Sequence, residues 1–268
     1  MASLVEQLIA GLREHPWPDY MLQSKSVEDI VASVADVLVP CVGGSLRDSG
    51  AVAEGRSKVG GLPDLPGSVA WPTERGRPLA FVCQVNLAEA GPHSDGALPT
   101  EGMLYLFSIY DADRAYGYEI VEDETARVIW CPKPGEVSAA AAPEGLRSEG
   151  IFEERGVQWG RSVTLERITE GVPSGATVDY SVVKVINELV LASGGQPAQL
   201  RMLGHAHFFR EENIEEYDAG LERLLLELSG YTVAKSAFGE GDFHLTIGAD
   251  DLASASLEKN TLVFEVGT

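Results

Sequence analysis

The sequence contains little cysteine and no long apolar run. Its three cysteines, Cys41, Cys83 and Cys131, are odd in number and lie far apart. No pair of them has the spacing of a metal site, and scattered thiols do not suggest a disulfide framework. No stretch approaches the roughly 20 apolar residues of a membrane-spanning helix, and the first residues lack the pattern of a signal peptide. We therefore expect free thiols, no membrane contact and a cytoplasmic location.

Basic residues are also scarce. Lysine and arginine together number 20 against 41 acids, which gives a formal net charge of −21 with neutral histidines. A field of this sign repels phosphate backbones and anionic lipids, and it attracts basic proteins. The charge thus argues against nucleic acid and membranes as partners and favours a basic protein partner. An acidic surface that serves only solubility is the alternative.

Motifs of known chemistry are missing as well. The sequence has no Gly-x-Ser-x-Gly elbow, no Walker A loop and no dinucleotide fingerprint. Ser45, Ser57 and Cys83 have no local motif that would activate them. We therefore predict no cofactor and no particular reaction, and the balance leans away from an enzyme.

The composition is that of an ordinary globular protein. Hydrophobic residues make up 44% and charged residues 23% of the 268 residues, and a chain of this length can bury a core without disulfides or metals. Two amphipathic helices are expected at the beginning. Capping boxes start them at Ser3 and Ser26, and Pro16 and Pro40 end them. A third helix is expected from Tyr180 to Ser193.

Short apolar runs rich in β-branched and aromatic residues predict the strands. These runs are 79–87, 102–110, 120–121, 128–131, 241–247 and 261–266. The segment 211–228 reads as a helix throughout or as a helix that leads into a strand at Leu224. Residues 132–150 have no clear period and read as a surface loop.

Two pairs of apolar runs resemble each other. Val82 to Asn86 carries a polar residue late in the run and is followed by a strand that opens at Gly102. Leu225 to Ser229 has the same pattern and is followed by a strand that opens at Gly241. The pattern favours two half-sheets of similar design, and chance is the alternative because apolar hairpins look alike.

The region from Ser57 to Leu87 also resembles a known family. It has a lysine before two glycines, two prolines, the pair Trp71-Pro72, and then a strand that ends in Gln84-Val85-Asn86-Leu87. This order is similar to that of the YwqG-like proteins, a bacterial family of unknown function. The resemblance covers about residues 55–268 and implies an α+β fold with an internal pseudo-repeat. It supplies no reaction, and the presence of related sequences near toxin and immunity genes is association rather than mechanism.

Together these observations predict an α+β fold with mixed or antiparallel sheets. Residues 1–55 are expected to form an N-terminal helical extension, and residues 56–268 one α+β domain. Within that domain, residues 56–135 and 180–268 would be two pseudo-repeated halves.

The glycine loop and the strand after it form a candidate ligand site. Its residues are Lys58, Gly60, Gly61, Gln84 and Asn86. Glycines let a backbone approach an anion, and Lys58 adds positive charge. Gln84 and Asn86 point to one face of the strand, where buried amides need hydrogen-bond partners. These residues either line a polar pocket or, in the structural alternative, hold a rigid loop in place.

A pair of histidines is a weaker candidate. His205 and His207 share a face if their segment is extended, and such a pair can bind a metal together with a third ligand, for which Glu211, Glu212 and His244 are the candidates. Two ligands alone are a weak signal, so partly buried or exposed histidines are the favoured interpretation and no metal is expected. His205 also stands where YwqG-like proteins often carry a tyrosine.

An acidic run suggests a surface for a partner. It contains Glu211, Glu212, Glu215 and Glu216, which pair like charges at helical spacing. Each such pair destabilises a helix by about 0.2–0.5 kcal/mol, which a basic partner would offset. A solvated helix face is the alternative.

The favoured function is a YwqG-like binding or regulatory protein, with an immunity-like inhibitor as one form, that recruits a basic partner. The alternative is an enzyme or small-molecule binder with a cleft between the halves, lined by Gln84, Asn86 and the 60–67 loop. Metal binding by the histidine pair is a third hypothesis. Trp71 is predicted to brace the fold, because Pro72 and the prolines before it restrict its movement.

Overall fold

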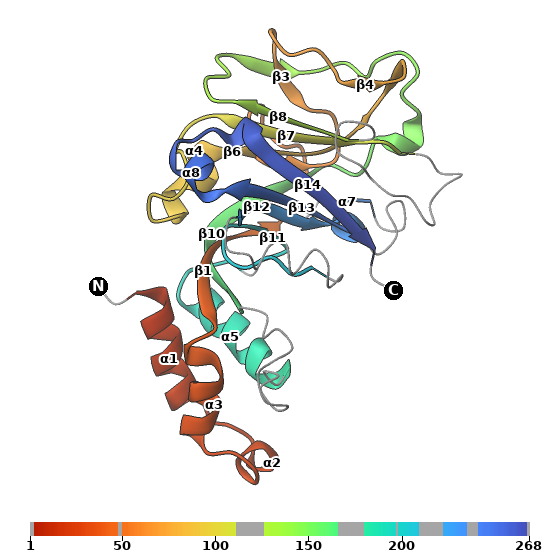
Figure 1. Ribbon diagram of the computed structural model, residues 1–268. Helices are drawn as coiled ribbons and strands as arrows, with labels where there is room; N and C mark the ends of the chain where they lie inside the picture. The colour runs from red at the N-terminus through yellow and green to blue at the C-terminus, as the bar shows by residue number, and fades with distance from the viewer. Residues whose placement is uncertain are drawn as a thin grey trace.

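A curled antiparallel sheet and a projecting helical arm make up the molecule (Figure 1). The computed structural model describes residues 3–47, 50–110, 126–165, 180–196, 198–208, 222–234 and 241–266. Within these residues, ten strands form the main sheet, and each is antiparallel to its neighbours. In spatial order they are β14 (Asn260–Val266), β13 (Gly241–Gly248), β12 (Glu222–Ser229), β11 (Leu200–Met202), β1 (Leu38–Leu46), β10 (Arg155–Leu165), β2 (Lys58–Val59), β6 (Ala80–Asn86), β7 (Met103–Ser108) and β8 (Ala126–Cys131).

Short strands and helices complete the fold. The strand β3 (Asp64–Pro66) pairs with β9 (Val137–Ala139), and β4 (Thr73–Glu74) pairs with β5 (Arg77–Pro78). The α-helices are α1 (Leu4–Glu14), α2 (Asp19–Leu22), α3 (Val27–Ala35), α4 (Leu87–Ala90), α5 (Tyr180–Ala192), α7 (Gly230–Ala234) and α8 (Ala249–Ala253). Short 3-10 turns lie at Gly91–His93, Ser148–Gly150 and Leu257–Lys259. In the described part of the chain, no helix is both long and apolar enough to cross a membrane.

The predicted α+β class and most of the predicted elements are confirmed. The runs 79–87 and 102–110 are β6 and β7, which pair with each other. The run 241–247 is β13, and it pairs with β12, which begins at Glu222 rather than at Leu224. The predicted strand at 120–121 and the beginning of the 211–228 segment lie outside the described residues.

The sheet curls so that its two ends enclose one hydrophobic core. At one end β8 lies against the turn Leu257–Lys259, which precedes β14 at the other end. The core between them contains side chains of both halves, among them Val85, Leu104, Leu226 and Phe243. Burial of each large apolar side chain contributes roughly 1.5–3 kcal/mol, so this core is the main source of stability.

The outer face of β6 and β7 carries a second core. Tyr105 and Phe107 pack there beneath Leu65. Trp71 lies half-buried at the edge, where its indole N–H donates to the Leu79 carbonyl at 2.9 Å. Its ring also meets Phe107 in a T-shaped contact with 5.6 Å between the ring centroids. These are the contacts of a bracing residue, and the contribution of Trp71 to stability stays a prediction.

The helical arm has a core of its own. Both predicted capping boxes are present, with Ser3 and Ser26 accepting hydrogen bonds from the third backbone amide of α1 and α3. The apolar stripes of α1, α3 and α5 meet in one cluster, against Leu38 and Leu165 at the ends of β1 and β10. Figure 1 shows the arm extending away from the sheet, with α2 at its far end.

The helix predicted to begin after Ser26, which is α3, is shorter than predicted. It ends at Ala35, and Pro40, which was expected to end it, lies inside the central strand β1. Residues 1–55 are therefore not a purely helical extension. The valine-rich run 37–42 favours a strand. The proline is tolerated because β11 pairs only with residues 42–44 of β1, so no ladder hydrogen bond needs the missing N–H.

The cysteines are free thiols. Cys41 and Cys83 are buried, whereas Cys131 is only half-buried. Burial raises the pKa of the Cys83 thiol to about 12, so this side chain stays protonated and unreactive at neutral pH.

Candidate functional site

Lys58 begins the glycine loop and lies buried among acids. Its side chain is 3% exposed, and its ammonium nitrogen lies 3.1 Å from Asp64 Oδ1 and 3.1 Å from Glu154 Oε2. A buried cation without partners would be strongly destabilising, so the two carboxylates are needed to keep it there. The lysine thereby connects β2 to β3 and to the residue before β10.

Gln84 is fully buried beside this lysine, because residues 58 and 84 are paired in register between β2 and β6. Its carbonyl oxygen accepts from the Asp64 backbone N–H at 2.8 Å. Its amide nitrogen donates to Asp64 Oδ2 at 2.7 Å and to the Arg56 carbonyl at 2.8 Å. The side chain therefore satisfies its polar groups by binding the loop on both sides of the two glycines.

Gly60 and Gly61 shape this loop through their backbone conformation. Both have positive φ values, 65° and 69°. A Cβ atom on Gly60 would lie 2.3 Å from the Glu153 carbonyl oxygen, so only glycine fits there. The two backbone N–H groups donate at 2.9 Å to the carbonyls of Val82 and Phe152. Both donors are thus used within the protein.

Asn86 differs from the other four predicted site residues because it borders a groove. Its side chain donates to the Gly55 carbonyl at 2.7 Å and accepts from the Ala88 N–H at 2.9 Å, which caps α4. The groove has a volume of about 370 Å³, and Lys133 and Glu101 also line it. The structure brings all five residues near one loop with the contacts of the structural alternative, and ligand binding by them stays a prediction.

The second half of the sheet, strands β11 to β14, carries a charged cluster. Arg201 on β11 is in register with Glu227 on β12, as Lys58 is with Gln84. Glu227 forms an ion pair with Arg201 and accepts from the His207 backbone N–H at 3.0 Å.

A buried histidine, His244, connects Glu227 to a second carboxylate in this cluster. His244 is 0% exposed, with Nδ1 at 3.3 Å from Glu227 Oε2 and Nε2 at 3.8 Å from Glu265 Oε2. Its ring packs on Phe208 with 4.5 Å between the centroids. A row of ionisable side chains therefore crosses β11 to β14 inside the second half.

Burial and neighbouring charges together determine the protonation states of Glu227 and His207. Burial alone would raise the pKa of Glu227, but the hydrogen bond from His244 and the charge of Arg201 outweigh it and lower this pKa to about 2. Burial, with a further contribution from Arg201, lowers the pKa of His207 to about 4. At neutral pH the carboxylate is therefore ionised and His207 is uncharged.

The histidine pair of the metal hypothesis lies at the edge of the same cluster. The backbone N–H of His205 donates to Thr164 Oγ1 at 3.0 Å, and His207 Nε2 lies 3.3 Å from the Leu165 carbonyl. Across the described ranges, no group of three or more His, Cys, Asp and Glu side chains is arranged to hold a metal. The acidic residues Glu211 and Glu212, considered as further ligands, lie outside those ranges.

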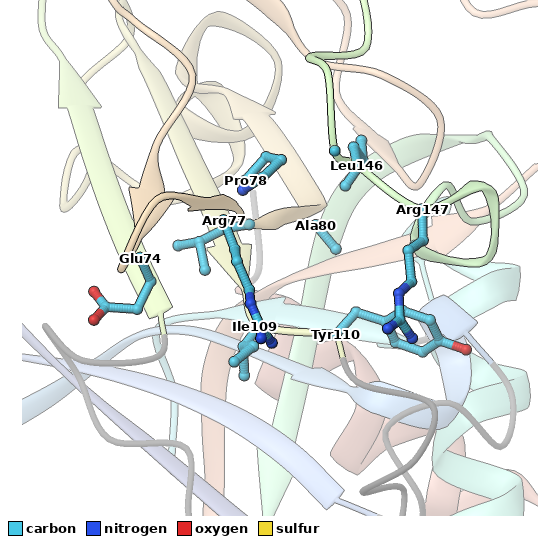
Figure 2. A pocket seen from close by; sticks show the side chains of 11 residues that line it. Glu74, Arg77, Pro78, Ala80, Ile109, Tyr110, Leu146 and Arg147 are labelled. Carbon is cyan, nitrogen blue, oxygen red and sulfur yellow. The ribbon is translucent and has the colours of Figure 1, made fainter.

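A pocket of about 270 Å³ opens on the first half, near the end of β7. Figure 2 shows the side chains of Arg77 and Arg147 extending into it, above Ile109 and Tyr110. The carboxylate of Glu74 points away from both arginines in this view. The pocket therefore combines two cationic groups with apolar side chains such as Pro78 and Ile109.

The tip of the helical arm exposes apolar side chains among acids. On α2, Tyr20 is 64% exposed and Leu22 is 42% exposed. The short helix is held from below by Trp17, which is buried and donates from its indole N–H to the Leu12 carbonyl at 2.9 Å. Residues 3–36 carry six exposed acids against the bases Arg13 and Lys25. The acids are Glu6, Glu14, Asp19, Glu28, Asp29 and Asp36.

Residues 57–265 match the family model of a domain of unknown function, DUF1963. The match covers most of the chain, and the chain therefore belongs to this family. It begins just before β2, so it includes nine of the ten described strands of the main sheet and leaves β1 and α1 to α3 outside. The comparison with curated proteins gives no match.

Sequence reasoning missed the charged cluster, the arginine pocket and the arm tip. Glu227 and His244 interrupt apolar runs, which is the signal that singled out Gln84, so the cluster was within reach of the same argument. Arg77 and Arg147 are far apart in the sequence, and nothing in the local pattern connects them.

Proposed function

We propose that this chain is a YwqG-like bacterial binding protein that acts in the cytoplasm by docking a basic protein partner, in the manner of an immunity-like inhibitor. The observation that carries the proposal is the exposed pair Tyr20 and Leu22 among the acids of the arm tip. Exposed aromatic side chains are favoured as anchors of protein interfaces. The surrounding acids would steer a basic surface toward them.

The local charge supports a basic partner in particular. Between residues 14 and 29, the tip carries Glu14, Asp19, Glu28 and Asp29 against Lys25 alone. The nearby Arg13 lies 3.4 Å from Glu28, in an exposed ion pair that bulk water screens. The acidic run Glu211, Glu212, Glu215 and Glu216 lies outside the described residues, and its part in partner binding stays a prediction.

The alternative of a ligand cleft between the halves has less support. The space between them holds the main hydrophobic core, with Val85 and Leu104 from one half and Leu226 and Phe243 from the other. Gln84 lies on the opposite face of β6, where it binds Asp64. We therefore place the binding function on the arm.

A photo-crosslinking experiment in the native host tests the proposal. A photoreactive phenylalanine derivative at position 20 should capture a basic protein, and the same substitution of Tyr231, which is 62% exposed on α7, should not. With the purified partner, the double variant Tyr20→Ala/Leu22→Ala should lose roughly 2 kcal/mol of binding, about thirtyfold in Kd. Both side chains are exposed, so the fold should be unaffected. Equal capture from positions 20 and 231, or unchanged affinity of the double variant, would contradict the proposal.

We also propose that the two halves of the sheet are pseudo-repeats. The strand orders β10-β2-β6-β7-β8 and β1-β11-β12-β13-β14 run outward from the centre in the same way. Two residues of positive φ follow β2 and β11 alike, at 60–61 and at 203–204. The loops then return to the sheet with equivalent hydrogen bonds, from the Asp64 N–H to Gln84 and from the His207 N–H to Glu227.

A further inference from the structure

The pocket on the first half concentrates positive charge in a protein of net charge −21. Arg77 and Arg147 line it, and Glu74 is the acid among the described lining residues. That glutamate lies 3.5 Å from Arg75 and 4.0 Å from Arg127, so neighbouring arginines outside the pocket balance its charge. The pocket itself therefore presents an excess of positive charge.

The two arginines come from different parts of the fold and converge on one space. Arg77 lies on β5, which forms a hairpin with β4, and Arg147 lies just before the turn Ser148–Gly150. Figure 2 shows both side chains extending in the same direction toward the level of Ile109 and Tyr110. Guanidinium groups present parallel N–H donors that match carboxylate and phosphate oxygens. Two of them at one opening are suited to an oxyanion.

The floor of the pocket is apolar and rigid. Its accessible apolar side chains are Pro78 on β5, Ile109 just after β7 and Leu146. Leu79 and Ala80, which also border the pocket, are 2% and 0% exposed and form the packed sheet that supports these side chains. The buried Gly150 closes the opposite wall, since a Cβ atom there would already lie 3.4 Å from the Tyr110 ring.

We propose that this pocket binds a small organic oxyanion, a carboxylate or phosphate that carries a compact apolar group. The arginines hold the anionic end, and the half-buried side chains of Pro78 and Ile109 hold the apolar end. The volume of about 270 Å³ is below the range of roughly 300–1,000 Å³ typical of drug-sized ligands, so the ligand is small. The site is separate from the arm tip and goes beyond the proposed partner binding.

Calorimetric titration at low salt with benzoate, phenyl phosphate and inorganic phosphate tests the proposal. We expect benzoate or phenyl phosphate to bind, and phenyl phosphate to bind more tightly than inorganic phosphate because it also covers the apolar floor. Arg77→Gln and Arg147→Gln should each weaken binding about tenfold. Arg13→Gln is the matched control, because its side chain is 52% exposed and lies on α1 of the helical arm, away from the pocket. It should change the Kd by less than about twofold.

The outcomes separate a built site from general attraction of anions to arginine. Equal losses in Arg13→Gln and Arg77→Gln would overturn the proposal, as would equal affinity for phenyl phosphate and inorganic phosphate. No measurable binding of benzoate or phenyl phosphate would also overturn it. Because Arg77 and Arg147 are exposed, an unchanged unfolding midpoint is expected for each variant and verifies that the fold is intact. The arm variants of the partner experiment should bind these anions normally, so each proposal can fail alone.

Discussion

The buried cluster of the second half makes stability depend on pH through His207. Its pKa in the folded protein is lowered to about 4 from an ordinary value of 6.5. Between these two values the unfolded chain takes up a proton that folded His207 does not. Acidification therefore favours the unfolded state, and the free energy of unfolding falls as pH decreases from 6.5 to 4.

The size of the effect follows from the two pKa values. Above pH 6.5 the histidine is neutral in both states, and it contributes no pH dependence. At pH 5 the linkage relation gives a loss of about 2 kcal/mol, and at pH 4 about 3 kcal/mol, relative to neutral pH. Glu227 extends the trend, because its folded pKa of about 2 lies below its ordinary value of 4.5. Its stabilisation is complete above pH 4.5 and is lost as pH falls toward 2.

Guanidinium chloride unfolding, followed by tryptophan fluorescence at pH 7, 6 and 5, measures this dependence. His207→Gln keeps a donor toward the Leu165 carbonyl but cannot titrate. Its stability should therefore fall by about 2 kcal/mol less than that of the wild type between pH 7 and 5. The control His15→Gln, on the helical arm, should follow the wild type. Parallel curves for the wild type and His207→Gln would refute the reasoning.

Two further predictions concern the first half. Trp71 is only half-buried, so Trp71→Ala should lower the free energy of unfolding by about 2–3 kcal/mol rather than the 3–5 kcal/mol of a fully buried tryptophan. Trp71→Phe should cost less. An unchanged denaturation midpoint of Trp71→Ala would instead mark this loop as an interaction surface. Gly76→Ala should cost about 1–2 kcal/mol for its positive φ alone. Gly60→Ala should cost clearly more in the same chemical denaturation assay, because a Cβ atom would also clash with backbone, and equal losses at the two glycines would contradict the clash.

The local pattern of the sequence predicts the outer strands but not the central ones. The runs that became β6, β7 and β13 are continuous and apolar, and their signal does not depend on distant residues. In β1 and β10, glycines replace the side chains that would show an alternation. Gly43 and Gly160 are required because Gln196 lies against both of them, so a Cβ atom would clash with it. This constraint comes from the loop after α5 and cannot be seen locally.

The candidate sites also differ in how far local sequence predicts them. Gln84 was predicted to need a partner because an amide inside an apolar strand is costly to leave unsatisfied, and the structure supplies Asp64 and Arg56 as partners. The arginine pocket was not predictable, since Arg77 and Arg147 meet only once the hairpin and the loop lie on the sheet. Long-range placement decides that site, and the local sequence does not encode it.

Gln84 and Glu227 accept hydrogen bonds from loop backbone N–H groups with different chemistry. In the first half, the side-chain amide of Gln84 accepts a hydrogen bond from the Asp64 backbone N–H, and this amide has no charge to gain or lose in the physiological range. In the second half, the carboxylate of Glu227 accepts a hydrogen bond from the His207 backbone N–H. This carboxylate stays ionised because Arg201 and His244 lie beside it and lower its pKa. One backbone connection thus depends on a neutral hydrogen bond and the other on balanced buried charges. His207 and Glu227, whose pKa values are both lowered, belong to this second connection, so their contribution to the pH dependence of stability arises there.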